Sequence, residues 1–216
     1  MLTLINRYPA RQRAQLIAAG ISLTRGTTPV LHEVDLVITP SSRVAIIGEN
    51  GRGKSSLLHV LTGAVTPDSG TVQLIGTVGI AEQEMTAEEN RTVGQVVAEA
   101  IAAPLAALVA LDAAASALTL GESGAEDRYA AALETAEALD AWDAERRVQI
   151  ALEALGAETD PARQLSALSV GQRYRVRLAC LLGADHDFIL LDEPTNHLDR
   201  DGLDFLTSQL RSRSGG

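Results

Sequence analysis

Nine residues, GENGRGKSS (Gly48–Ser56), stand between two stretches of different character. The run that leads into them, RVAIIG, shares Gly48 with them, is apolar and has the length of a buried strand, and the run after them, LLHVLTG, has the composition of a helix. A strand, the pattern GxxxxGK[ST] and a helix, in this order, form a loop whose backbone N–H groups bind phosphate oxygens. The sequence therefore predicts an α/β fold with a nucleotide-phosphate site at this loop.

Each residue type in this loop suits a bound phosphate. The glycines let the backbone curl so that its N–H groups point at phosphate oxygens. Lys54 is expected to reach the β- and γ-phosphates and to act in catalysis, and the Ser55 hydroxyl is expected to hold Mg²⁺. The residues assigned here to nucleotide binding are Gly48, Asn50, Gly51, Gly53, Lys54, Ser55 and Ser56.

A second segment whose residues could bind a ligand or take part in catalysis is DFILLDEPTNHLD (Asp187–Asp199). Its apolar residues Phe188 to Leu191 predict a buried parallel strand, and ligands sit at the C-terminal ends of such strands in open α/β sheets. That end carries Asp192, expected to orient Mg²⁺, and Glu193, expected to polarise the attacking water as general base. Paired acids after a strand often form only a solvated turn, but the P-loop upstream favours the catalytic interpretation.

Other local patterns predict strands and a second anion site. The segments QLIAAGISL (Gln15–Leu23) and VLHEVDLVI (Val30–Ile38) flank a turn at Gly26–Pro29, as antiparallel strands do. Farther along, the polar turn Ser169–Gln172 runs straight into a helix, and a helix N-terminus suits an anion. The chain thus carries a second candidate phosphate contact far from the first.

With the P-loop, LSVGQ and LLDEPTNHLD in this order, the chain resembles the ATP-binding cassette (ABC) ATPases over nearly its whole length. The resemblance implies a P-loop α/β cassette with a mixed, largely parallel sheet core, an antiparallel β subdomain and an α-helical subdomain. It also implies that two cassettes sandwich two ATP molecules head to tail, so that each signature, here Leu168–Gln172, touches the nucleotide on the other cassette's P-loop. The signature residues expected on that nucleotide are Ser169, Gly171 and Gln172.

The same resemblance implies roles that the local sequence leaves open. Gln83, which follows the predicted strand Val78–Ala81, would be the Q-loop glutamine, a catalytic residue that senses Mg²⁺ and the γ-phosphate. Asp199 would be the D-loop aspartate at the nucleotide, and His197 a D-loop residue without a catalytic role. Without the order of the motifs, Gln83 would be interpreted as an ordinary surface glutamine.

Two features favour the ABC-F branch of this family, whose members are soluble tandem-cassette proteins that act on ribosomes, some as antibiotic-resistance factors. The interval between Gln83 and Ser169 is longer than transporter cassettes need, and its composition predicts helices over Val93–Leu118 and Glu126–Leu155. The second feature is EPTNHLD itself, which is similar to ABC-F sequences. The resemblance therefore implies a helical arm and, for the parent protein, a second cassette and the ribosome or its RNA as partners.

Three positions depart from the family pattern. Val170 replaces the usual second glycine of the signature, which puts a β-branched side chain where the backbone approaches phosphate. Arg25 stands where the family often has an aromatic residue on adenine; a guanidinium can also stack on a base, so Arg25 is assigned to nucleotide binding. The chain stops at Ser214–Gly216, before the family's next strand and its switch histidine, and we expect a fragment cut inside the first cassette of a longer protein.

The composition of the chain limits the classes of protein to which it can belong. The net charge of −10 argues against a protein that coats nucleic acid, although a local basic patch is compatible with it. The single cysteine, Cys180, excludes a disulfide framework and fits a protein of the reducing cytosol. We expect Cys180 itself to be a small residue of the core. The apolar stretch Ala100–Leu120 holds Pro104 and Asp112, and a central Asp costs about 2.5–3.5 kcal/mol in a membrane helix. With no targeting segment apparent in Met1–Ala19, we expect a cytoplasmic protein that does not insert into membranes.

Some helical residues have more than one interpretation. Trp142 is expected to be a packing anchor rather than a stacking partner for a base. Three residues recur at helical spacing and are expected to face the partner helix of the arm: Tyr129, Leu133 and Ala136. Three basic residues after the signature form either a solvated helix face or a contact with phosphate or RNA: Arg173, Arg175 and Arg177.

The sequence thus predicts one cassette, incomplete at its C-terminus, with three parts: 15–83 (β subdomain and part of the P-loop core), 84–168 (helical subdomain with arm) and 169–216 (signature helix, Walker B strand and D-loop). It is expected to bind ATP with Mg²⁺ and, with a second cassette, to hydrolyse it, and its parent protein is expected to act on the ribosome. Two alternatives are the ATP-binding subunit of a membrane transporter and an ATP-gated clamp whose turnover is incidental.

Overall fold

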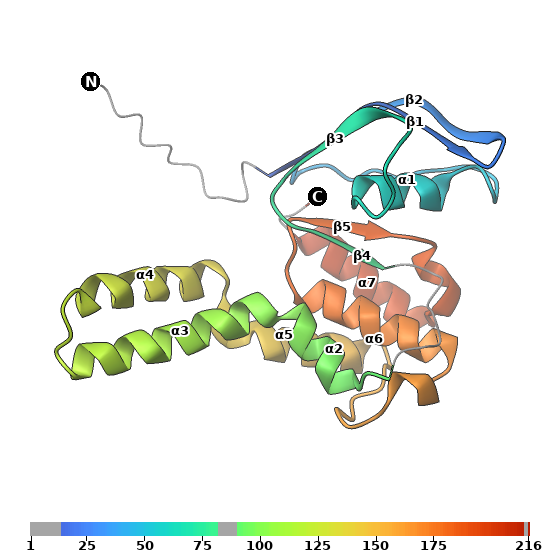
Figure 1. Ribbon diagram of the computed structural model, residues 1–216. Coiled ribbons are helices and arrows are strands. Elements are labelled where there is room, and N and C mark those ends of the chain that lie inside the picture. Colours follow the sequence, from blue (N-terminus) through green and yellow to red (C-terminus); the bar gives the residue numbers. More distant parts are fainter. Residues whose placement is uncertain (1–13, 82–89, 214–215) are drawn as a thin grey trace, which may run out of the picture. The chain divides into compact units, whose positions relative to one another are not determined.

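Figure 1 shows the computed structural model, which describes residues 14–81, 90–213 and 216. Within these ranges the chain forms two compact units. The first is drawn from Met1–Glu84, Asp185–Asn196 and Leu206–Gly216, and the second from Met85–Ala184 and His197–Phe205. The division into three parts made from the sequence stays a prediction.

The first unit contains a three-stranded antiparallel sheet. Its strand order is β2–β1–β3, with β1 at Gln15–Arg25, β2 at Thr28–Ile38 and β3 at Ser69–Ile75. The predicted hairpin is confirmed, and both of its strands reach closer to the turn than the apolar pattern indicated. Gly26 supplies a φ of 63° in that turn, a left-handed conformation that other residues rarely adopt.

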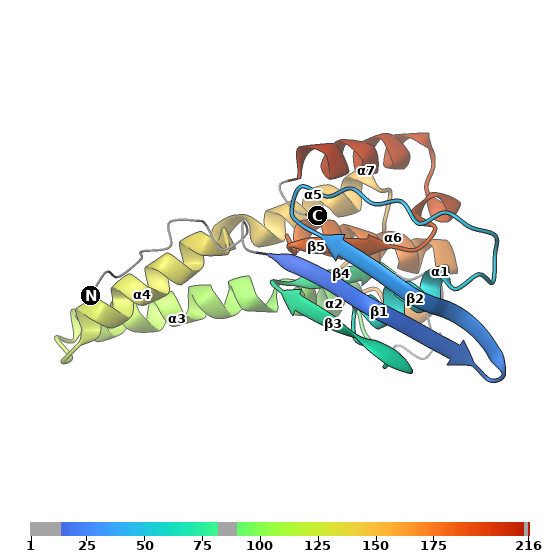
Figure 2. The same ribbon diagram turned by 90° about the horizontal axis from the view of Figure 1, so that it is seen from above.

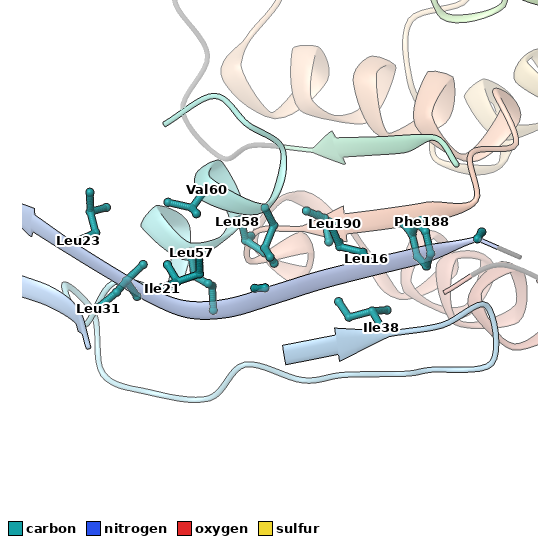
Figure 3. Close-up of a cluster of buried hydrophobic side chains, with 13 residues drawn as sticks. Leu16, Ile21, Leu23, Leu31, Ile38, Leu57, Leu58, Val60, Phe188 and Leu190 are labelled. Atoms are coloured by element: carbon teal, nitrogen blue, oxygen red, sulfur yellow. The ribbon is translucent and has the colours of Figure 1, made fainter. Parts of the chain in front are cut away.

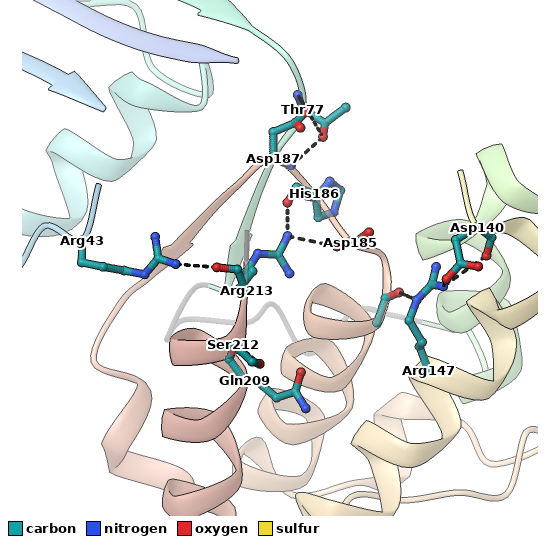
Figure 4. Close-up of polar contacts among 11 residues, drawn as sticks. Arg43, Thr77, Asp140, Arg147, Asp185, His186, Asp187, Gln209, Ser212 and Arg213 are labelled. Atoms are coloured by element: carbon teal, nitrogen blue, oxygen red, sulfur yellow. Dashed lines mark hydrogen bonds and ion pairs between the residues drawn. The ribbon is translucent and has the colours of Figure 1, made fainter. Parts of the chain in front are cut away.

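A second sheet in the same unit is the parallel pair β4 (Val78–Ala81) and β5 (Phe188–Leu191), both predicted at these positions. A reciprocal pair of hydrogen bonds precedes the two strands (Figure 4). The Thr77 N–H donates to Asp187 Oδ2 at 2.8 Å, and the Asp187 N–H donates to Thr77 Oγ1 at 2.9 Å. These contacts align two segments that lie 110 residues apart in the chain.

The apolar core of the first unit joins the antiparallel sheet, helix α1 (Lys54–Leu61) and β5 (Figure 3). The alternation of β1 turns every second residue of its first half inward, and the 3.6-residue period of α1 turns one face toward the sheet. The buried members are Ala14, Leu16, Ala18, Ile21, Leu23, Leu31, Ile38, Leu57, Leu58, Val60, Leu61, Phe188 and Leu190. This core carries the P-loop helix and the strand that leads to Asp192.

The strand predicted over Arg43–Gly48 is not formed with any described residue. Val44, Ile46 and Ile47 are 51%, 38% and 93% exposed, so the expectation of a buried strand is wrong here. An apolar run becomes a strand only where a neighbour offers hydrogen-bond partners. Residues Val44–Ile46 line a pocket together with β5 and do not pair with it.

Arginine side chains form hydrogen bonds at the C-terminal end of helix α7 (Arg200–Ser212), an end that belongs to the first unit (Figure 4). The Arg43 side chain donates from Nε to the carbonyl oxygen of Leu210 at 3.2 Å and from Nη2 to that of Arg213 at 2.8 Å. Arg213 in turn donates from Nη2 to the carbonyl oxygen of His186. The bonds from Arg43 satisfy carbonyl groups at the end of α7 that have no intrahelical partners, and the bond from Arg213 ties this end to the residue His186 before β5.

His186 is expected to make the stability of the first unit depend on pH. Burial and the nearby Arg213 guanidinium lower the pKa of His186 below its usual value of 6.5, against opposing effects of Asp185 and Asp187. The unfolded chain therefore binds this proton more readily, so its protonation favours unfolding as the pH falls below about 6.5. We expect urea unfolding to show lower stability at pH 5.5 than at pH 7.5, and His186→Gln to reduce that difference. The exposed His32→Gln variant is the matched control; equal pH dependence in all three proteins would contradict the assignment.

The second unit is helical. Its helices are α2 (Val93–Ala100), α3 (Ala102–Thr119), α4 (Ala125–Ala138), α5 (Ala144–Ala154) and α6 (Val170–Gly183). Figures 1 and 2 both show α3 and α4 side by side, as an antiparallel hairpin that extends beyond α2, α5 and α6. The hairpin is the arm that the composition of this interval predicts.

Each of the two long helices predicted for this interval is broken in two. Pro104 explains the first break, because its ring clashes with the carbonyl four residues earlier, at Ala100, where α2 ends. Asp140 explains the second, because its φ of 45° is left-handed and cannot continue a helix. Arg147 fixes Asp140 by donating to its carboxylate and, at 3.1 Å, to its carbonyl oxygen (Figure 4).

The hairpin packs through small side chains. Ala107 of α3 and Ala136 of α4 are buried together with Ala141, and Leu108, Leu111 and Leu139 pack against them. The expectation that Ala136 faces the partner helix is confirmed, while Tyr129 and Leu133 are only half-buried. Trp142 is 53% exposed, so its prediction as a packing anchor is wrong.

By length and composition alone, one described helix, α3, could cross a membrane. Helices of proteins that never contact a membrane can have the same length and composition. Helix α3 carries Asp112 near its middle and packs against α4. The expectation that the chain does not insert into membranes stays a prediction.

Candidate functional site

The P-loop lysine is held by its own loop. Lys54 opens α1, and its Nζ donates to the carbonyl oxygens of Gly48 at 2.9 Å and Glu49 at 3.2 Å and to Asn50 Oδ1 at 3.3 Å. The loop oxygens therefore position the ammonium group at the N-terminus of a helix, where the unpaired N–H groups and the helix dipole favour an anion.

Two of the three predicted P-loop glycines have the backbone that only glycine adopts readily. Gly51 and Gly53 have φ values of 79° and 89°, whereas Gly48 shows no such conformation. Gly53 is also closely packed, because a Cβ there would lie 2.6 Å from the carbonyl oxygen of Val30. A side chain at position 53 would thus move the loop away from β2.

The C-terminal end of β5 presents the two predicted acids. The Asp192 N–H donates to the carbonyl oxygen of Ala81 at 3.1 Å, which extends the β4–β5 ladder up to the first acid. Glu193 then has a left-handed φ of 46°, a conformation that costs energy in a non-glycine residue and is found at functional sites.

Both oxygens of the Glu193 carboxylate have partners. Asn196 donates from Nδ2 to Glu193 Oε2 at 2.8 Å, and Lys54 Nζ lies 3.9 Å from Glu193 Oε1. Asn196 was not singled out in the sequence. The signal for it was its spacing of three residues from Glu193, because the short 3₁₀ turn Pro194–His197 brings residues i and i+3 onto one side.

The structure brings Lys54, Asp192 and Glu193 together, since all three line one pocket of the first unit, with a volume of about 540 Å³. Among the described residues no group of three His, Cys, Asp or Glu side chains forms a ready-made metal site. Mg²⁺ does not need one, because it is usually held by one or two protein oxygens together with substrate phosphates and water. Asp192 and the exposed Ser55 hydroxyl in the first turn of α1 are oxygen donors of that kind.

Two predicted site residues are not joined to this pocket. Arg25 is exposed at the end of β1, opposite Thr28 across the hairpin turn, and is not among the described residues that line the pocket. Gln83 lies outside the described residues. Both assignments stay predictions.

The signature residues lie in the second unit, at the start of α6. Ser169 and Gln172 form a capping box: the Gln172 N–H donates to Ser169 Oγ, and the Ser169 N–H donates to Gln172 Oε1, each at 3.2 Å. Val170 is the first residue of α6 and its side chain is 47% exposed, so a valine fits this helical turn.

His197 and Gly171 are neighbours. A Cβ at Gly171 would lie 3.6 Å from His197 Nδ1, which is ordinary contact, and the His197 ring lies 5.3 Å from that of the buried Tyr174. His197 thus packs against the first turns of the signature helix. The expectation that His197 has no catalytic role stays a prediction.

The arginines after the signature do not form a solvated face. Arg173 is only 7% exposed and donates from Nη1 to the carbonyl oxygens of Leu168 at 2.8 Å and Leu165 at 3.5 Å. Arg175 and Arg177 are half-buried. The solvated interpretation is therefore wrong, because most of α6 is buried, and Arg173 holds the turn that precedes Ser169.

Two further residues of these helices have structural partners. Asp199 Oδ1 accepts the N–H of Gly202 at 2.9 Å and thereby caps the first turn of α7. Cys180 of α6 is 4% exposed, as expected for a core residue, and burial raises the pKa of its thiol to about 12. A role of Asp199 at a nucleotide stays a prediction.

Comparison with known proteins gives a consistent picture. A family model described as "ABC transporter" matches residues 31–196. The tylosin resistance ATP-binding protein of Streptomyces fradiae is 36% identical over 214 residues, which cover 94% of this chain and 38% of that protein. The energy-dependent translational throttle protein of Mycobacterium tuberculosis is 33% identical over 194 residues, which cover 88% of this chain and 34% of that protein. The chain thus spans little more than a third of the length of these relatives, which are ABC-F proteins.

Solved structures share the fold. One titled "Structure of ATP binding subunit of ABC transporter" aligns with a TM-score of 0.67 at 19% identity over 92% of this chain and 74% of that one. The protein cbiO1 from Clostridium perfringens, part of the ABC transporter complex cbiONQ, aligns with a TM-score of 0.51 at 23% identity over 91% of this chain and 72% of that one. The predicted fold class is confirmed.

Proposed function

Because the chain belongs to the ABC transporter family of ATP-binding domains, we propose that its P-loop pocket binds MgATP and that Glu193 promotes ATP hydrolysis. The observation that supports this proposal is the meeting of the two motifs. Lys54 from the P-loop and Asp192 and Glu193 from the end of β5 line one pocket, although most of the chain separates them in sequence. Members of this family are ATPases, and the loop and acids have the residue types that this reaction uses.

In this proposal each residue of the pocket has a role that follows from its chemistry. The Lys54 ammonium binds the β- and γ-phosphates, and the loop N–H groups around Gly51 and Gly53 donate to phosphate oxygens. Ser55 and Asp192 would hold Mg²⁺, which neutralises charge on the phosphates when it is bound. Glu193 accepts the proton of the attacking water, and Asn196 keeps the carboxylate oriented through its bond to Oε2.

A second cassette completes the site in this proposal. Ser169 and Gln172 use their side chains to cap α6, and the helix N-terminus that they form suits a phosphate. In the head-to-tail arrangement of two cassettes, this N-terminus would contact the nucleotide of the partner cassette. Gln83, Arg25 and Asp199 retain their proposed places at the nucleotide.

For the longer protein that contains such a cassette, we propose action on the ribosome. The names of the similar proteins support this, since one confers tylosin resistance and another throttles translation. The α3–α4 hairpin of the second unit supports it as well, because its helix α3 exposes Leu105, Val109 and Leu118. A cytoplasmic location follows from the same proposal.

Co-sedimentation with ribosomes tests this role. We expect the Glu193→Gln variant of the longer protein to pellet with purified bacterial ribosomes through a sucrose cushion in ATP and to stay in the supernatant in ADP. The Lys54→Ala variant of the same protein is the control, because it retains the arm and should not pellet in either nucleotide. Pelleting to the same extent in ATP and in ADP, or no pelleting in either nucleotide, would contradict the ribosomal role.

The ATP-binding subunit of a membrane transporter is the second candidate, favoured by the titles of the solved structures of the same fold. Such a subunit would bind membrane vesicles that contain its transmembrane partner and would not bind ribosomes. The same sedimentation experiment, repeated with inverted membrane vesicles from the source cells, separates the two candidates.

A further inference from the structure

An apolar groove lies in the second unit, at the base of the α3–α4 hairpin. It has a volume of about 400 Å³, and its walls come from α2, α3, α5 and the loop that contains Thr159 and Pro161. The large apolar residues that line it are Val93, Val97, Ile101, Leu105, Val148 and Leu152. Because this volume is more than twice that of a cavity of about 150 Å³ that binds benzene, the groove can take bulky apolar side chains.

The apolar surface continues from the groove along the outer side of α3. Leu105 lines the groove, and Val109, one helical turn later on the same side, is 69% exposed. Asp112 and Ser116 continue this side at exposed positions, and Asp112 is the only charged residue of α3. From Leu105 to Ser116 this side is about 17 Å long, at about 1.5 Å per residue. We call the groove together with these four residues the arm face.

Acidic residues lie within and around the arm face. Asp112 belongs to it, Glu145 lies on the rim of the groove, and α4 carries further exposed acids. The exposed carboxylates of α3, α4 and this rim form no ion pair with any residue that the structure describes. They are Asp112, Glu126, Asp127, Glu134, Glu137 and Glu145. The one arginine of the hairpin, Arg128, is already paired with Glu122 at 2.7 Å.

This charge argues against three possible occupants of the arm face. Antiparallel helices pack about 8–10 Å apart, close to the screening length of about 8 Å at physiological ionic strength, so the carboxylates of α4 act on whatever covers α3. Nucleic acid is bound through lysine and arginine contacts to its phosphates, and amphipathic helices that bind anionic lipid carry the same residues. A second copy of the chain would add further unpaired carboxylates. RNA, an anionic membrane and a second copy are therefore disfavoured.

We propose that the arm face binds an amphipathic helix of a different protein, with Lys or Arg residues beside its apolar side. Apolar side chains of the partner at helical spacing fill the groove and cover Val109, as in other complexes in which a helix lies in a groove. Its basic residues pair with Asp112 and Glu145, which selects this partner over neutral or acidic helices. The inference does not rest on the proposed ATPase or ribosomal role. On a ribosome, the partner of the arm is then a basic protein and not RNA.

Binding of a model peptide by the 216-residue chain, without nucleotide or ribosome, tests the proposal. The probe is the fluorescein-labelled peptide LKKLLKLLKKLLKLLKKL, whose leucines lie on one side of a helix, and the comparison peptide has Glu in place of every Lys. We expect fluorescence anisotropy to give at least about tenfold tighter binding of the lysine peptide. Val109→Lys should weaken that binding by at least about tenfold, because it puts a repelling charge in the middle of the arm face. Val37→Lys, at a 57% exposed valine of β2, is the matched control and should leave the affinity unchanged.

Crosslinking locates the bound peptide. A water-soluble carbodiimide joins carboxylates to amines, and Lys54 is the only lysine of the chain, so the lysines of the peptide mark its binding site. We expect mass spectrometry to place the crosslinks at Asp112 and Glu145. Crosslinks spread evenly over the exposed acids of both units, no binding of the lysine peptide, or undiminished binding by Val109→Lys would overturn the proposal.

Two anionic probes test the occupants that the charge of the arm face disfavours. Duplex RNA and phosphatidylglycerol vesicles should bind the chain more weakly than the lysine peptide does. Binding of either probe with an affinity equal to that of the peptide would overturn the proposal. All of these readouts remain valid if the proposed ATPase or ribosomal function is wrong.

Discussion

Glu193→Gln is expected to slow ATP hydrolysis by about 10²- to 10⁴-fold while MgATP affinity stays near the wild-type value. The amide is nearly isosteric with the carboxylate and keeps an oxygen that can accept the Asn196 bond, but it cannot take the proton of the attacking water. Phosphate release per chain is the measurement, and it should be made over a range of protein concentrations. If a second cassette completes the site, specific activity of the wild-type chain rises with concentration.

The matched control for this variant is Glu134→Gln, an exposed glutamate on α4 of the second unit. It makes the same chemical change away from the pocket and should leave phosphate release unchanged. Wild-type turnover in Glu193→Gln would show that another group serves as general base. Turnover that does not depend on protein concentration would show that one cassette suffices.

Lys54→Ala is expected to weaken MgATP binding by about 10- to 100-fold, since hydrogen bonds to charged groups contribute about 1.5–3 kcal/mol. Titration calorimetry with the 216-residue chain measures the loss. Lys54→Arg is the comparison variant: it keeps the positive charge but replaces a compact ammonium by a planar fork, so intermediate affinity is expected. Unchanged affinity in Lys54→Ala would refute the P-loop assignment.

The composition of the chain offers an independent check on the same residue. Lys54 is the only lysine in the sequence, so an amine-acylating reagent has one side-chain target besides the N-terminus. Bound MgATP should protect Lys54 from acylation, and mass spectrometry of the peptide that contains it reads out the protection. Acylation at the same rate with and without MgATP would contradict direct contact between Lys54 and phosphate.

Local patterns predicted the elements whose formation depends on nearby residues. The hairpin β1–β2, a helix directly after the P-loop and the strands β4 and β5 follow from alternation, glycines and short apolar runs, and all are present, although α1 begins at Lys54, three residues before the predicted helical run. The helix breaks at Pro104 and Asp140 were missed because the composition of the interval is strongly helix-forming. Pro104 was visible in the sequence, whereas the left-handed backbone of Asp140 depends on the Arg147 contacts across the turn.

Features that depend on distant partners were beyond the sequence. The run Arg43–Gly48 has the composition of a strand but pairs with no described residue, because pairing requires a neighbour that composition does not reveal. The burial of Arg173 and the exposure of Trp142 likewise depend on how α6 and α5 pack. At the candidate site, residue types and order predicted the meeting of Lys54 with Asp192 and Glu193. The contribution of Asn196 became visible only with the 3₁₀ turn in place.

The parallel pairing of β4 with β5 has a consequence for how the chain can be rebuilt and how it folds. Parallel neighbours cannot be joined by a tight turn, so some crossover of a dozen or more residues is obligatory between Ala81 and Phe188. The helices of the second unit fill that crossover, and turns within each helix form quickly from local contacts, while the β4–β5 ladder must wait for closure of a long loop. The crossover is therefore a suitable place for exchange: we expect that helical segments of other lengths can be grafted there while the Thr77–Asp187 bonds still set the register of β5.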